Sequence, residues 1–71
     1  MISEIGKFSW EDTENALALI SYAFFVLYES HKDKEIEADP HLKQIRKNLR
    51  AYSVALGARR YQLVMESYGK T

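Results

Sequence analysis

The sequence predicts an all-α fold, an antiparallel hairpin of two long helices, and three observations support this prediction. Apolar residues recur at helical spacing over most of the 71-residue chain. Glycine occurs only three times and proline once, so a many-stranded β fold would lack its turn residues. Helix-starting signals stand at two places, Ser9 and Asp39-Pro40. We therefore expect one helical domain over residues 1–71.

The first helix is expected over residues 10–31, after an N-terminal arm at residues 1–9. Ser9 precedes Asp12 by three residues, as in a capping box with Asp in place of Glu. The Ser9 hydroxyl can accept a hydrogen bond from an unpaired N–H, and an acidic first turn suits the positive end of the helix dipole. The arm is too short for independent structure, but its apolar side chains can pack onto the helices.

The second helix is expected over residues 40–67, because Asp39 is a good N-cap and Pro40 is favoured at the first helical position. Residues 32–39 form a polar stretch that either extends the first helix or makes the turn. Residues 68–71 are left as a tail.

Gly57 leaves a second arrangement open. Glycine inside a helix costs about 1 kcal/mol relative to alanine and often marks a kink or a break. A break at residues 56–58 would make the C-terminal third a separate short helix, which could fold back over the first helix in a compact monomer. A continuous helix would instead match the first one in length and lie antiparallel to it.

Both helices carry more apolar surface than a hairpin can cover. The first is apolar almost all round between residues 16 and 28, whereas a surface helix needs an apolar stripe only slightly wider than 100°. The second has an extra apolar stripe at Val54, Ala58, Tyr61, Met65 and Tyr68. We therefore expect a homodimer, in which two hairpins close into a four-helix bundle. The residues expected to mediate self-association are Tyr22, Phe25, Val26, Tyr61 and Met65.

The charges are separated along the chain although they sum to zero. Residues 1–39 carry nine acidic and three basic side chains, and residues 40–71 carry seven basic and one acidic. The basic residues form a stripe on the second helix, so we expect it to bind an acidic protein surface or, less favourably, a nucleic acid. The residues expected to bind this partner are Lys43, Arg46, Arg50 and Arg60.

Internal pairing is the alternative explanation of this charge separation. In an antiparallel hairpin, the bases near residue 45 would lie close to the acids of the turn, and those near residue 60 close to the acids at the start of the first helix. The first group joins Lys43, Arg46 and Lys47 to Asp33, Glu35 and Glu37, and the second joins Arg59 and Arg60 to Glu11, Asp12 and Glu14. A net charge of zero favours this pairing over nucleic-acid binding, because it provides no long-range attraction to phosphate.

The side chains that could bind a metal ion or act as a nucleophile do not form a motif in this sequence. Carboxylates and histidines alternate around the turn, but a calcium loop starting at Asp33 would have Ala38 where glycine is needed and Gln44 where a bidentate Glu is needed. The chain has no cysteine, and Ser21 and Ser53 stand in the middle of the expected helices with no histidine nearby in the sequence. We therefore expect no enzymatic activity, no catalytic or metal-binding residue and no cofactor.

The expected function is that of a small non-enzymatic regulatory or adaptor protein that acts through protein–protein interaction and self-association. The alternative is a dimeric nucleic-acid-binding regulator that uses the basic stripe of the second helix. No membrane association is expected, because the longest apolar stretch, residues 16–28, is shorter than the roughly 20 residues that span a bilayer. The lack of cysteine favours the cytoplasm.

Overall fold

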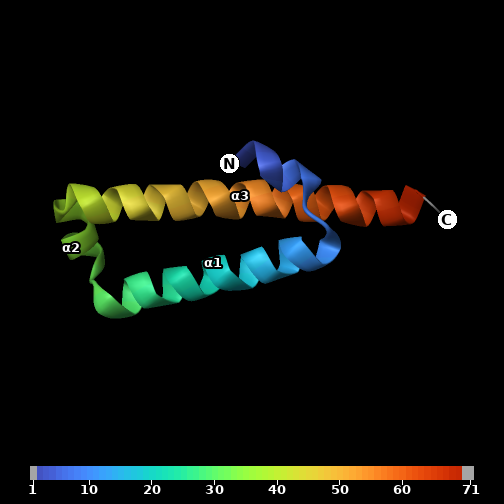
Figure 1. Ribbon diagram of the computed structural model, residues 1–71. Coiled ribbons are helices and arrows are strands. Elements are labelled where there is room, and N and C mark those ends of the chain that lie inside the picture. Colours follow the sequence, from blue (N-terminus) through green and yellow to red (C-terminus); the bar gives the residue numbers. More distant parts are fainter. Residues whose placement is uncertain (1, 70–71) are drawn as a thin grey trace.

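The structure is a computed structural model that describes residues 2–69 and the side chains of residues 3–69. Its elements are a 3₁₀-helix η1 (Ile2–Lys7) and the α-helices α1 (Trp10–Ser30), α2 (Asp33–Ala38) and α3 (Pro40–Gly69) (Figure 1). No strand occurs within residues 2–69, so the all-α prediction is confirmed for them. Residue 1 of the predicted arm and residues 70 and 71 of the predicted tail lie outside the described residues.

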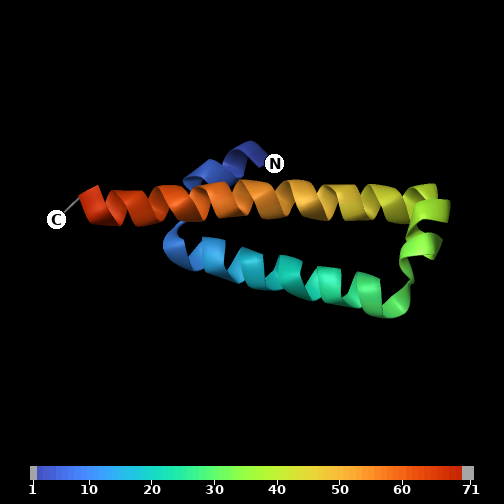
Figure 2. The same cartoon turned by 180° about the vertical axis from the view of Figure 1, so that it is seen from behind.

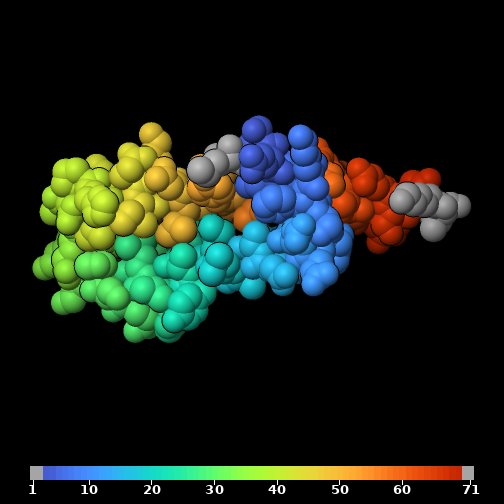
Figure 3. All heavy atoms as spheres, viewed as in Figure 1, coloured from blue at the N-terminus to red at the C-terminus, as the bar shows by residue number. Residues whose placement is uncertain are grey.

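The helices α1 and α3 run side by side in opposite directions, and α2 joins them at one end (Figures 1 and 2). The principal-axis extents are 50 × 21 × 14 Å. The segment η1 lies on one side of α3, and the C-terminal end of α3 projects beyond α1 (Figure 3). Most of α1 is therefore covered on one side only, and the end of α3 extends past the helix that covers the rest of it (Figures 1 and 3).

Side-chain capping sets the start of α1. The Ser9 hydroxyl accepts a hydrogen bond of 3.1 Å from the Asp12 N–H, as the sequence predicts. The buried Thr13 hydroxyl donates 2.8 Å to the Ser9 carbonyl, which adds a second contact at the same turn. The helix ends at Ser30, one residue before the predicted end, where the backbone of His31 becomes extended.

The polar stretch of residues 32–39 neither extends α1 nor remains a simple turn, because most of it forms the short helix α2. The Glu35 carboxylate accepts a hydrogen bond of 3.3 Å from the Lys32 N–H and so caps its start. Ile36 is completely buried, and α2 packs on α3. One apolar side chain in a polar stretch thus anchors the connection to the hairpin.

The helix α3 begins at Pro40 after the predicted N-cap. The Asp39 carboxylate accepts hydrogen bonds from the N–H groups of His41, at 2.9 Å, and of Leu42, at 3.4 Å. The helix runs without a break to Gly69 and passes through Gly57 with no positive φ angle. The alternative with a break at residues 56–58 is therefore wrong.

The core lies where α1, α3 and the N-terminal segment meet. The buried apolar side chains within residues 3–69 are Ile5, Leu27 and Leu56 in this core and Ile36 in α2. The N-terminal segment, which the sequence left without structure of its own, is held on α3 by Ile5 and by Arg59. The Arg59 Nε donates a hydrogen bond of 2.9 Å to the carbonyl oxygen of Phe8.

We expect the substitution Gly57→Ala to stabilise the fold. A Cβ added at Gly57 has no atom within 4 Å, apart from the local helix backbone, and alanine has the higher helix propensity. The free energy of unfolding, measured by urea denaturation, should rise by about 0.5–1 kcal/mol. The control Ala58→Gly, at the next exposed position, should lower it by a similar amount. A decrease with Gly57→Ala would mean that the helix is not continuous.

Candidate interaction surfaces

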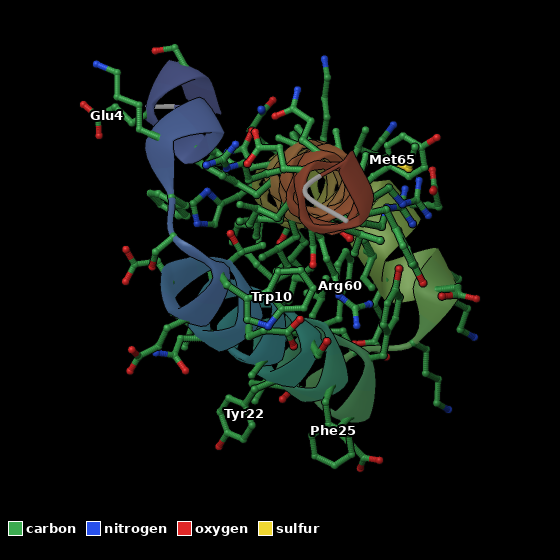
Figure 4. The ribbon with its side chains drawn as sticks, turned by 90° about the vertical axis from the view of Figure 1, so that its right-hand side faces the viewer. Glu4, Trp10, Tyr22, Phe25, Arg60 and Met65 are labelled. Atoms are coloured by element: carbon green, nitrogen blue, oxygen red, sulfur yellow. The ribbon has the colours of Figure 1, made fainter. Side chains whose placement is uncertain are left out.

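One apolar surface lies on α1 outside the part of the helix that is buried against α3. It consists of Leu19, Tyr22, Phe25 and Val26, whose exposed fractions are 69, 66, 61 and 42%. Figure 4 shows Tyr22 and Phe25 projecting away from α3. We call these four residues the α1 face. It is exposed because α1 is apolar almost all round, and α3 covers only one of its sides.

A second apolar surface lies on α3. It consists of Val54, Tyr61, Met65 and Tyr68, whose exposed fractions are 74, 66, 50 and 71%. We call these residues the α3 face. Met65 projects from α3 in a direction away from α1 (Figure 4). Because the residues recur at intervals of three, four and seven, they share one side of the helix.

All five residues predicted to mediate self-association are exposed, but they do not form one surface. Tyr22, Phe25 and Val26 belong to the α1 face, and Tyr61 and Met65 belong to the α3 face. The compact monomer that the sequence left open would have covered Tyr61 internally, and the structure leaves it 66% exposed. Large exposed apolar patches of this kind are typical of protein interaction sites.

Three of the four basic residues predicted to bind a partner form ion pairs within the chain. Arg46 and Lys43 both contact the Glu37 carboxylate, the latter with Nζ 3.8 Å from Oε2. The Arg60 Nε lies 2.9 Å from Glu14 Oε1. The internal pairing predicted for these three bases is therefore observed, and it reduces their availability to an outside partner.

Arg59 does not pair with the acids at the start of α1, so that part of the predicted pairing is wrong. Its guanidinium binds the Phe8 carbonyl and lies 4.0 Å from Glu66 Oε1. The reason is geometric, because η1 occupies the side of α3 on which Arg59 lies. The carboxylates of Glu11 and Asp12 are left exposed and form no ion pair within the described part of the chain.

A basic groove lies beside the first three turns of α3, with a volume of about 500 Å³. It is lined by Glu37, Pro40, Lys43, Gln44, Arg46, Lys47 and Arg50. Lys47 and Arg50 are exposed, and no carboxylate of residues 3–69 forms an ion pair with them. The pairing that the sequence predicts between Lys47 and the acids of the turn is therefore not observed, and Lys47 and Arg50 are the bases best placed to meet an acidic partner.

The hydrogen bond from Arg46 to Glu37 lowers the pKa of the Glu37 carboxyl below its ordinary value, and the Arg46 charge adds to this effect. The same hydrogen bond raises the pKa of Arg46. Each shift favours the ionised form of its group, so the pair remains ionised over a wider pH range than the two groups would separately. The pair joins α2 to α3, so it contributes to the position of the connection beside the basic groove.

Among the described residues, few side chains that could bind a metal ion or transfer a proton lie close together. No group of three His, Cys, Asp or Glu side chains that could hold a metal ion occurs among the described residues. His31 Nδ1 lies 3.9 Å from Glu35 Oε2 across the link between α1 and α2, which forms an ion pair only when the imidazole is protonated. None of the described helices has an apolar stretch long enough to cross a bilayer.

Comparisons with protein-family models, with curated proteins and with solved structures found no match to this chain. Its function is therefore inferred from the two apolar faces and the basic groove. Sequence reasoning did not select Leu19 or Val54 for self-association, although both are more exposed than any of the five residues it chose. Their positions in the two apolar stripes were the available signal.

The lowered pKa of Glu37 predicts an acid-dependent loss of stability. The folded carboxyl has the lower pKa, so its contribution is present above the ordinary carboxyl pKa and is lost as the pH falls through the folded value. Lowering the pH from 7 should therefore reduce the urea midpoint of the wild type more than that of Glu37→Gln. The control Glu29→Gln removes an exposed carboxylate without an observed ion pair and should keep the wild-type pH dependence. An unchanged pH dependence in Glu37→Gln would contradict the assignment.

Proposed function

We propose that this chain is a small protein-interaction module, without chemistry of its own, that associates with further copies of itself and regulates or connects another protein. The observation that carries the proposal is the α1 face, where four large apolar side chains lie exposed on one helix. Two of them are aromatic, and aromatic side chains are enriched in the buried centres of protein interfaces. A homodimer is the smallest assembly that would cover this face.

The small core gives a second reason for association. Chains of this length bury only about 60% of the surface that they expose when unfolded, and they often depend on disulfides, metals or oligomerisation. This sequence has no cysteine for a disulfide. Burial of Leu19, Tyr22, Phe25 and Val26 between copies would add apolar surface to the core, and each large apolar side chain that becomes fully buried contributes about 1.5–3 kcal/mol.

An acidic protein surface is the partner that suits the basic groove. Lys47 and Arg50 form no ion pair among residues 3–69, although the Arg50 charge acts on Glu37, and Lys43 shares this single carboxylate with Arg46. A partner carboxylate near Arg50 would gain a charge-assisted hydrogen bond. In this proposal the apolar faces mediate association, and the groove selects the sign of the partner's charge.

Sedimentation equilibrium tests self-association directly. At saturating concentration the wild type should have at least twice the mass of one chain. The double substitution Tyr22→Glu/Phe25→Glu should shift it to the monomer, because burial of two carboxylates is costly. Both positions are exposed, so the monomer should keep its helical circular dichroism.

The matched control adds two glutamates elsewhere. Ser3→Glu/Asn48→Glu changes two exposed positions outside both apolar faces and outside the lining of the basic groove, and should associate like the wild type. A wild type that stays monomeric at millimolar concentration would refute the proposed self-association.

Nucleic-acid binding is the second candidate, and the exposed Lys47 and Arg50 favour it. If it is correct, the chain should retain a labelled oligonucleotide at low salt, and Lys47→Glu/Arg50→Glu should abolish this binding. The control Lys32→Glu/Lys34→Glu makes the same change of charge near α2 and should bind as the wild type does. No retention at low salt would remove this candidate.

A further inference from the structure

The two apolar faces cannot both be covered by one symmetric contact between two copies. Tyr22 and Phe25 of the α1 face project away from α3, and Met65 of the α3 face projects away from α1 (Figure 4). A symmetric contact joins the same face of two copies. It therefore covers the α1 face or the α3 face and leaves the other in water.

Along each face a charged residue comes first and apolar residues follow it. The charge is positive on α3 and negative on α1. On α3, Lys47 precedes Val54 and Tyr61 at intervals of seven residues, and seven residues are close to two turns. On α1, Glu11 precedes Ala18 and Phe25 at the same intervals. Each face thus begins with a charge at its N-terminal end and continues with apolar residues, and on α1 a second exposed carboxylate, that of Glu29, follows Phe25 by one turn. Glu11 and Lys47 are both exposed and form no ion pair within residues 3–69.

We infer that the α3 face of one copy binds the α1 face of the next copy, with the two helices parallel. This inference rests on the proposed self-association and specifies which surfaces meet. In the parallel register Lys47 lies opposite Glu11, and Tyr61 lies opposite Phe25, about 21 Å further along each helix. One contact then provides both an ion pair and an apolar match.

Contacts between identical faces are less favourable. Two α3 faces in parallel would bring Lys47 close to its own copy, and two antiparallel ones would place Lys47 and Arg50 against apolar side chains. Two antiparallel α1 faces would bury their apolar residues but would leave the α3 face exposed. The head-to-tail contact covers both kinds of face, and it repeats from copy to copy until a ring closes or a filament forms.

Mixing two blocked variants tests this inference. Tyr22→Glu/Phe25→Glu blocks the α1 face, and Tyr61→Glu/Met65→Glu blocks the α3 face; all four positions are exposed in the single chain. Each variant should be monomeric alone, because a head-to-tail contact needs both faces. An equimolar mixture should form a 1:1 complex of twice the chain mass, since each variant supplies the face that the other lacks.

The other outcomes overturn the inference in distinguishable ways. If the variant with a blocked α3 face self-associates like the wild type, the contact joins two α1 faces. If the variant with a blocked α1 face self-associates, the contact joins two α3 faces. A mixture that remains monomeric means that one contact needs both faces of each copy. Each of these results leaves the proposed self-association standing, whereas a monomeric wild type removes it.

Charge reversal then tests the register within the 1:1 complex. Lys47→Glu in the variant that supplies the α3 face should weaken the complex about two- to fivefold at low salt. Glu11→Lys in its partner should restore the affinity. Restoration by Glu29→Lys instead would show an antiparallel register and would overturn the parallel one.

Discussion

The contact between α1 and α3 is the constraint on which the rest of the structure depends, because each helix can bury only one of its sides there. Leu27 of α1 and Leu56 of α3 are buried in this region, and the N-terminal segment adds Ile5. Both helices also carry apolar residues on their other sides, and no element within residues 2–69 covers these residues. The exposed α1 and α3 faces follow from this limited amount of covering material, as does the proposal that another copy supplies it.

The basic side chains of α3 fall into two groups, those that form ion pairs within the chain and those that remain available to a partner. At the start of α3, Glu37 engages Arg46 and Lys43 and so fixes α2 against the helix. Further along, Arg60 pairs with Glu14 of α1. These bases are mainly structural, although all lie in the stripe that the sequence marks as basic. Lys47 and Arg50 remain available, and they lie next to the apolar residues of the α3 face.

Local features of the fold were predictable from the sequence, and long-range ones were not. The starts of α1 and α3 depend on hydrogen bonds that the Ser9 and Asp39 side chains accept from backbone N–H groups two or three residues further along, and such contacts leave a sequence pattern. The helix α2 has one local contact of this kind, the hydrogen bond that the Glu35 carboxylate accepts from the Lys32 N–H, but its position depends on the burial of Ile36 and on packing against a helix that follows it in the chain. The residues of the candidate surfaces could be predicted from the sequence, but the directions in which these surfaces face could not. Periodicity places Tyr22 and Met65 on stripes of their own helices, whereas only the packing of α1 on α3 turns them apart.

The hydrogen bond between Arg59 and Phe8 joins residues that are 51 positions apart. It connects the N-terminal segment to the part of α3 around Arg59, so each of these two segments stabilises the position of the other. Truncation from either end therefore affects the opposite end as well. A fragment cut before Arg59 would lose the guanidinium that holds the Phe8 carbonyl, so the segment of residues 2–8 belongs to the same folding unit as the C-terminal helix.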